Sequence, residues 1–201
     1  MKLFPHYSFF GFSNLYLLGN DDRKEALIVD PAEMNAVILG YIEKNDYALK
    51  AVLVTHNHIH HVRGLKTLLK IYDPRIYAAN VQVLGVPCQP VRDGESFEAC
   101  GFEIVPYSLP GHSPDSVAYR VDRLLFTGDA LHAGIIGSTH STFNTSTLVR
   151  RIGERVLDQP DDCVILPGHG PPSTVGTERR FNLGLKPGYA ERVTDRYDFF
   201  V

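Results

Sequence analysis

Three histidine-containing motifs, each following a run of apolar residues, constrain this chain of 201 residues more than any other feature. The first is Thr-His-Asn-His-Ile-His-His at 55–61, and the others are Pro-Gly-His at 110–112 and at 167–169. Asp129 follows a fourth apolar run, within Phe-Thr-Gly-Asp. Short apolar runs rich in β-branched residues predict buried strands. The chain is therefore expected to fold so that several strand ends meet along one rim.

The dense first motif can contribute to more than one metal ion. Imidazole and carboxylate are ligands of zinc and of non-haem iron. His56 and His58 are two residues apart, so their side chains share a face in an extended segment. His60 and His61 are adjacent and diverge, which lets one loop serve two metal positions. Unrelated surface histidines or a histidine-rich tract are simpler interpretations, but they do not explain why the two distant histidines also follow apolar runs beside glycine.

Taken together, the motifs resemble the signature of the metallo-β-lactamase superfamily: His-x-His-x-Asp-His, a distant His, an Asp after Thr-Gly and a final Gly-His. The resemblance extends from about Asn14 to Asn182. It is strongest to the short type II glyoxalases (hydroxyacylglutathione hydrolase-like proteins), through Leu-Pro-Gly-His-Ser-Pro-Asp-Ser-Val at 109–117 and Pro-Gly-His-Gly-Pro-Pro-Ser-Thr at 167–174. It implies an α+β fold, a four-layer αββα sandwich with two mixed sheets inside. It also implies a single domain over 1–201, without the C-terminal helical domain that binds glutathione in full-length relatives.

The resemblance further implies a binuclear metal site. The first metal position is formed by His56, His58 and His112. The second is formed by His61, His169 and the residue at position 60, and Asp129 bridges the two. The implied cofactors are two divalent metal ions, zinc ahead of iron or manganese. A hydroxide between the metals attacks a thioester or ester carbonyl, because a metal lowers the pKa of bound water and polarises the carbonyl. In this scheme Asp129 and His60 are the catalytic residues.

Position 60 departs from the family pattern, because His60 occupies the place of the signature's Asp. Imidazole binds metal as a neutral ligand, so the site loses one negative charge. His60 either still ligates the second metal, or turns away and leaves that position weak or empty, or changes the preferred metal. We expect the first outcome. His132 and His140 also stand where relatives carry other residues; the simplest interpretation is that both are ordinary polar loop residues, and the alternative is that His140 approaches the metals.

Other functions are compatible with the same residues. A lactonase would use the same hydrolytic site. An iron-dependent oxygenase of the persulfide dioxygenase kind needs one redox-active metal held by two histidines and a carboxylate. His112 and Asp129, together with His56 or His58, could supply that set. A protein that only binds metal would have lost catalysis together with the signature's Asp.

Composition restricts the partners and the compartment. The net charge is −3 without a basic stripe or tail, which argues against nucleic acid. No apolar run approaches membrane length, and residues 1–7 contain no apolar signal core. Cys88, Cys100 and Cys163 are widely spaced, which favours unpaired cysteines in a reducing compartment. We expect a cytoplasmic enzyme with a small-molecule substrate, and neither nucleic acid nor a membrane as its partner.

The secondary structure is predicted to mix strands and helices along the whole chain. Strands are expected near 14–18, 26–29, 51–54, 75–78, 102–105, 116–121, 123–126 and 163–166, and helices near 32–45, 62–71, 145–157 and 175–183. Turn residues at 19–22 and 121–123 predict two hairpins. We expect Asn144 or Thr145 to cap the third helix and Thr174 to cap the fourth. Gly64 is expected to relax the backbone where the second helix begins.

Overall fold

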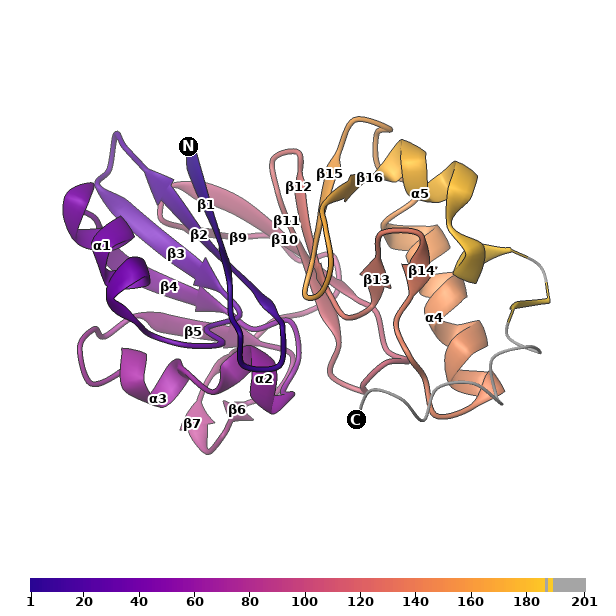
Figure 1. Cartoon of the computed structure of the whole chain (residues 1–201), viewed down its shortest axis with the longest axis horizontal. Helices are drawn as coiled ribbons and strands as arrows, with labels where there is room; N and C mark the ends of the chain where they lie inside the picture. Colours follow the sequence, from indigo (N-terminus) through magenta and orange to yellow (C-terminus); the bar gives the residue numbers. More distant parts are fainter. Residues whose placement is uncertain (187, 190–201) are drawn as a thin grey trace.

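The computed structural model describes residues 1–186, 188 and 189, and it consists of two six-stranded sheets packed face to face (Figure 1). The first sheet contains, in spatial order, β1 (Lys2–Tyr7), β2 (Asn14–Asn20), β3 (Glu25–Val29), β4 (Ala48–Leu53), β5 (Arg75–Ala78) and β8 (Gln89–Pro90). The second contains β16 (Ser173–Thr174), β15 (Val164–Pro167), β12 (Leu124–Gly128), β11 (Val117–Val121), β10 (Phe102–Ser108) and β9 (Phe97–Ala99). Two short hairpins are formed by β6 (Gln82–Val83) with β7 (Val86–Pro87) and by β13 (Leu131–His132) with β14 (Ile135–Ile136).

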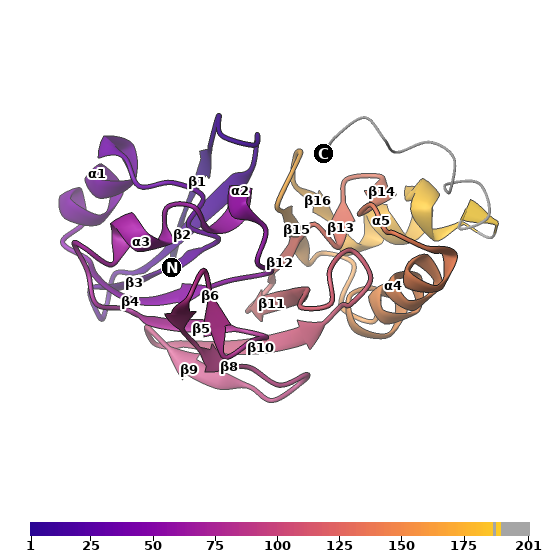
Figure 2. The same ribbon diagram turned by 90° about the horizontal axis from the view of Figure 1, so that it is seen from below.

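The helices cover the outer faces of both sheets, which confirms the expected αββα sandwich. Those on the first sheet are α1 (Ala36–Lys44), α2 (Ile59–Val62) and α3 (Leu65–Leu68). Those on the second are α4 (Thr142–Arg155) and α5 (Val175–Phe181), followed by the 3-10 helix η1 (Leu183–Leu185). Figure 2 shows the two helical layers on opposite sides of the molecule. Within the described part of the chain, no helix has the length and apolar character needed to cross a membrane.

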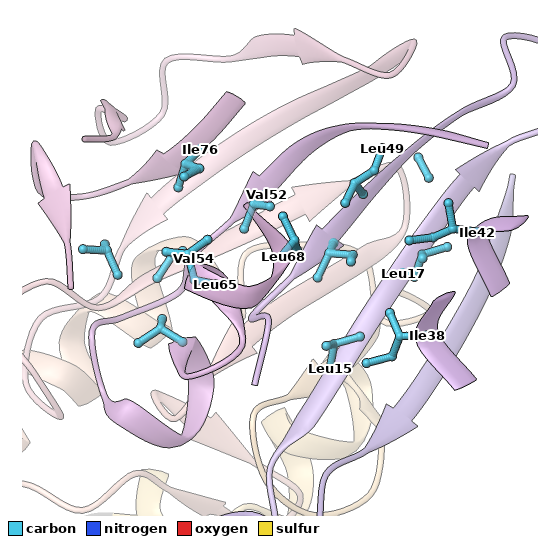
Figure 3. Packing of buried hydrophobic residues seen from close by; sticks show 14 of the residues in the cluster. Leu15, Leu17, Ile38, Ile42, Leu49, Val52, Val54, Leu65, Leu68 and Ile76 are labelled. Carbon is cyan, nitrogen blue, oxygen red and sulfur yellow. The ribbon is translucent and has the colours of Figure 1, made fainter. Parts of the chain in front are cut away.

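Alternation along β2 explains how one strand supports two layers. Leu15 and Leu17 belong to an apolar cluster with Ile38 and Ile42 of α1 (Figure 3). Tyr16, which lies between the two leucines, belongs instead to the cluster between the sheets. Successive side chains of a strand point to opposite faces, so an uninterrupted apolar run is buried on both sides.

The second sheet is built in the same way. Phe126 of β12 packs in the cluster between the sheets. Its neighbour Leu125 packs on the other side, in the cluster that contains Leu148 and Ile152 of α4. Each sheet is therefore fixed both to the other sheet and to its own helical layer.

Strand directions bring the functionally interesting strand ends to one rim. β3 pairs with β4 in parallel, and β12 pairs with β15 in parallel. The residues that follow parallel neighbours lie at the same edge of a sheet. β11 is antiparallel to both β10 and β12, so the β10–β11 loop reaches the edge where β12 ends. At this rim the two sheets are joined by a backbone hydrogen bond of 2.8 Å, in which the N–H of Val117 donates to the carbonyl of Thr55.

The N-terminus of α4 differs from the prediction. Ser141, rather than Asn144 or Thr145, caps this helix, because its hydroxyl accepts the backbone N–H of Asn144 at 3.1 Å. The helix therefore begins at Thr142, earlier than the apolar periodicity indicated. Thr174 caps α5 as predicted.

The role predicted for Gly64 was wrong. The expected helix over 62–71 is divided into α2 and α3 near this residue, but its φ of −73° is an ordinary right-handed value. A Cβ at Gly64 would lie 2.6 Å from the carbonyl oxygen of Pro31 and from backbone atoms of Glu33. The Gly64 N–H also donates to that carbonyl at 2.8 Å. Close backbone packing, not backbone freedom, requires a glycine here.

Candidate metal centre

The predicted ligands come from four segments that end at the common rim. His56 lies in the turn after β4, and His58 is the residue before α2. His112 lies in the β10–β11 loop, Asp129 directly follows β12, and His169 follows β15. Figure 2 shows the segment leading to α2 beside β12. Residues far apart in the sequence are thus gathered by the sheet topology.

Three histidines form a tight group around one point. The Nδ1 of His58 lies 2.9 Å from the Nε2 of His56 and 3.1 Å from the Nε2 of His112. A tetrahedral metal with Zn–N bonds of 2.0–2.1 Å holds its ligand nitrogens about 3.3 Å apart. The observed separations are close to that spacing.

The tautomers of this group are set by neighbouring acceptors. The Nδ1–H of His112 donates to the carbonyl of Ser138 at 2.9 Å. The hydroxyl of Thr55 donates to Asp30 at 2.7 Å and so accepts from the Nδ1 of His56 at 3.0 Å. Both Nε2 atoms are left with lone pairs toward the cluster. Burial lowers the pKa of His112 to about 4 and also lowers that of His56, so both rings are neutral at pH 7.

A second pair of histidines faces the carboxylate of Asp129. The Nδ1–H of His61 donates to Asp30 at 3.1 Å, and the Nδ1–H of His169 donates to the carbonyl of Phe12 at 3.0 Å. Their Nε2 atoms both lie 3.3 Å from Oδ2 of Asp129. In the neutral rings these nitrogens would direct lone pairs at a carboxylate oxygen, which is unfavourable unless a cation lies between them.

The pKa of His61 also indicates that positive charge is favourable at this position. Burial acts to lower its pKa, but Asp129 and Asp30 outweigh burial and raise the pKa to about 10. Burial acts to raise the pKa of Asp129, yet His61 and the surrounding rings hold it well below its usual range. Positive charge is therefore favoured between these groups, where a metal ion would bind.

A single oxygen lies close to most of the cluster. Oδ2 of Asp129 lies within 3.7 Å of five ring nitrogens, which belong to His56 (3.7 Å), His60 (3.6 Å), His61 (3.3 Å), His112 (3.7 Å) and His169 (3.3 Å). Among the described residues, two groups have ligand atoms that all lie within 4.8 Å of one another: His56, His58, His112 and Asp129, and His56, His60, His61 and Asp129. His169 is outside the second group, although it approaches Oδ2 as closely as His61 does. The donor set fits a divalent metal site.

A sequence profile described as the metallo-beta-lactamase superfamily matches residues 9–84 and 81–169 of this chain. The chain belongs to the metallo-beta-lactamase superfamily. Hydroxyacylglutathione hydrolase GloC of Haemophilus influenzae is 32% identical to it over 186 residues, which cover 81% of this chain and 88% of that protein. The resemblance predicted from the histidine motifs is thereby confirmed.

Solved structures of the superfamily share the fold. The metallo-beta-lactamase from Staphylococcus aureus has a TM-score of 0.87 at 21% identity and covers 98% of this chain and 67% of its own. TTHA1623, solved in a di-iron-bound form, has a TM-score of 0.72 at 25% identity and covers 90% and 98%. The likeness to the Staphylococcus aureus protein concerns the fold alone, because the sequence identity is only 21%.

Within this candidate site, His60 points toward the cluster. Its Nε2 lies 3.6 Å from Oδ2 of Asp129, and its ring centroid is 5.1 Å from that of His169. The hydroxyl of Ser13 donates to the carbonyl of His60 at 2.7 Å. A Cβ at Gly11 would lie only 2.3 Å from the Cβ of His60, so the 8–13 loop packs directly on this residue. His60 therefore does not turn away from the cluster, and its ligation of the second metal stays a prediction.

The two additional histidines have different environments. His132 is 20% exposed, and its Nε2 lies 3.6 Å from Oδ1 of Asp129. His140 is exposed in the segment before α4, and among the described residues it has no hydrogen bond, ion pair or ring contact with the cluster. The structure therefore joins His132 to the site and leaves His140 at the surface.

The prediction missed Asp30, which supports two of the ligands. Its carboxylate accepts from the N–H of Thr55 at 2.8 Å, from the Thr55 hydroxyl and from His61. Asp30 is 2% exposed and has a φ of 52°, which is unusual for a residue with a side chain. The available signal was a carboxylate directly after the apolar run 26–29, without the Thr-Gly that precedes Asp129.

Proposed function

We propose that the protein is a metal-dependent hydrolase of thioesters or related esters, similar to type II glyoxalase, acting on a small-molecule substrate. One observation carries the proposal: two groups of imidazoles share a single carboxylate oxygen, Oδ2 of Asp129. The name of the Haemophilus influenzae relative supports the substrate class. The expected cofactors are two divalent ions, zinc ahead of iron or manganese, and the di-iron form of TTHA1623 keeps iron in consideration.

The residues divide into those that hold the ions and those that orient the holders. His56, His58 and His112 would hold one ion, and His60, His61 and His169 the other, with Asp129 shared. Ions held there would lower the pKa of a bound water and polarise the substrate carbonyl. Asp30, Thr55 and two backbone carbonyls fix the ring tautomers, so that nitrogen lone pairs face the ions.

Burial indicates the side from which substrate reaches the site. The side chains of His56 and His61 are 1% and 0% exposed, whereas those of His60 and His169 are 29% and 26% exposed. The substrate carbonyl is therefore expected to approach past His60 and His169. His60 would then take part both in holding an ion and in lining the approach.

The second candidate function is that of a mononuclear iron oxygenase. The observation in its favour is that the first candidate group alone offers three histidines and a carboxylate, whereas a mononuclear iron site needs two histidines and a carboxylate. Such an enzyme would consume oxygen with a thiol persulfide as substrate.

Metal content and oxygen dependence separate the two functions. Protein purified without chelators or added metal would be analysed by elemental mass spectrometry, and hydrolysis of S-lactoylglutathione would be followed with and without oxygen. We expect close to two ions per chain and hydrolysis that is unchanged under anaerobic conditions. One iron per chain, with oxygen consumption on a persulfide and no hydrolysis, would replace the hydrolase proposal with the oxygenase.

A further inference from the structure

The two oxygens of the Asp129 carboxylate have different surroundings. Oδ2 faces the candidate ligands, whereas Oδ1 faces His132, whose Nε2 is 3.6 Å away. Oδ1 and this Nε2 are both buried, and neither has a hydrogen-bond partner among the described residues. Buried polar atoms without partners are rare in folded proteins. Because these two atoms face each other, we infer that they interact with each other.

The ring hydrogen of His132 can lie on Nε2. In His61, His112 and His169 the Nδ1–H is donated to a carboxylate or carbonyl, which leaves Nε2 as an acceptor. The Nδ1 of His132 has no such partner within residues 1–186, 188 and 189. Its Nε2–H can therefore donate to Oδ1, and a shift of about half an ångström converts the present separation into a hydrogen bond.

The surrounding backbone holds the ring of His132 in this position. His132 belongs to the β13–β14 hairpin, where it pairs with Ile135. The N–H of Gly134 in the turn donates to the buried carboxylate of Glu178 at 3.0 Å. Gly168 also packs closely on the carboxylate, because a Cβ there would lie 2.4 Å from Oδ1. His132 is thus the side chain placed to pair with Oδ1.

We propose that His132 is a positioning residue whose Nε2–H holds Oδ1 of Asp129 and thereby keeps Oδ2 directed at both metal positions. The inference rests on the proposed metal centre, but not on the identity of the substrate. The orientation of Asp129 matters more here because position 60 contributes no carboxylate. Without His132 the carboxylate can rotate about its Cβ–Cγ bond, and the shared oxygen is no longer fixed.

Zinc titration of the full-length chain tests this role. His132→Phe keeps a ring of similar size but removes the donor, and His132→Gln retains an N–H at nearly the same reach. Metal-free protein would be titrated with zinc in competition with a chromophoric chelator. We expect His132→Phe to lower the zinc affinity of the weaker of the two metal positions by about 10-fold or more, as for other partners of metal ligands. If the chain binds only one zinc ion, the same loss is expected at that position. His132→Gln should restore affinity to within about threefold of the parent chain.

The controls separate this inference from folding and from the proposed function. His140→Phe introduces the same residue at an exposed histidine outside the cluster and should leave zinc affinity unchanged. Circular dichroism melts of all variants report whether each chain is folded. Parent-like zinc affinity in folded His132→Phe would refute the positioning role, and so would failure of His132→Gln to recover affinity. Loss of zinc affinity in a chain that hydrolyses no thioester would leave this inference standing and remove the hydrolase proposal.

Discussion

Asp30 orients His61 from a backbone conformation that few residues adopt. We expect Asp30→Asn to weaken zinc binding by about 10- to 100-fold, because an amide has one acceptor oxygen where the carboxylate has two. Asn tolerates the φ of 52°, so the backbone is kept. Competitive zinc titration measures the loss. Asp122→Asn, at a φ of 54° in an exposed hairpin turn, is the matched control. A similar loss in both variants would contradict a specific role for Asp30.

Position 60 offers the opposite test, a gain of affinity. His60→Asp restores the carboxylate of the superfamily signature and adds a negative charge near Oδ2 of Asp129, where the Nε2 of His60 now lies 3.6 Å away. We expect the second zinc position to bind about 10-fold more tightly, a change equivalent to about 1.4 kcal/mol. Isothermal titration calorimetry resolves the two positions. Unchanged affinity would show that His60 already holds the ion as well as a carboxylate does.

The ligands themselves could be predicted from the sequence, whereas their supporting residues could not. His56, His112 and Asp129 each sit beside glycine or threonine after an apolar run, and that repeated pattern is a local signal. Asp30 also follows an apolar run, but its neighbours are Val29 and Pro31 rather than glycine or threonine. Its role depends on contact with His61, which is 31 residues away. His132 was indistinguishable from His140 in the sequence, because the hairpin that turns it inward depends on Glu178.

At the scale of elements, the buried strands could be predicted from the sequence, whereas the edge strand β1 could not. β1 was missed because its sequence includes Pro5 and none of its residues is fully buried. Proline is tolerated in an edge strand, which need not donate every hydrogen bond, and β1 lies at the edge of the first sheet. The caps of α4 and α5 show the same limit: Thr174 was identified, but Ser141 lies before the apolar periodicity begins.

The junction of α2 and α3 provides a stability prediction. Gly64→Ala places a Cβ 2.6 Å from backbone atoms of Pro31 and Glu33, which cannot move as a flexible side chain would. We expect the free energy of unfolding to fall by about 1–3 kcal/mol, as measured by urea denaturation. Gly40→Ala in α1, where nothing lies within 4 Å of the new Cβ, should instead raise it by up to about 1 kcal/mol. Equal effects of the two substitutions would contradict the packing argument.

At the scale of the whole molecule, the candidate site joins the two halves of the sandwich. Residues 56–61 follow a strand of the first sheet, and the other ligands follow strands of the second. The family resemblance predicted this architecture; periodicity alone indicated only a mixture of helices and strands. Hydrophobic patterns record which faces are buried, but not which sheet each strand joins.

Metal removal should therefore lower the stability of the entire fold. Zinc at 100 times its dissociation constant is expected to add about 2.7 kcal/mol per position to the free energy of unfolding. Calorimetry with zinc and with chelator measures the difference in Tm. Magnesium is the control, because a site rich in imidazole favours zinc over magnesium. A Tm that is insensitive to zinc would contradict binding at the junction of the two sheets.

The spacing of the ligands along the chain also has a kinetic consequence. His56, His58, His60 and His61 remain neighbours when the chain is unfolded, whereas His112, Asp129 and His169 join them only after long loops have closed. The unfolded chain therefore retains a local chelating tract, and zinc bound to it stabilises the wrong state. We expect refolding, followed by circular dichroism, to be slower with zinc present from the start than with zinc added afterwards. Equal rates would mean that the isolated tract binds no zinc. Slower refolding with zinc present from the start would mean that the spacing of the histidines in the sequence determines whether folding must precede metal uptake.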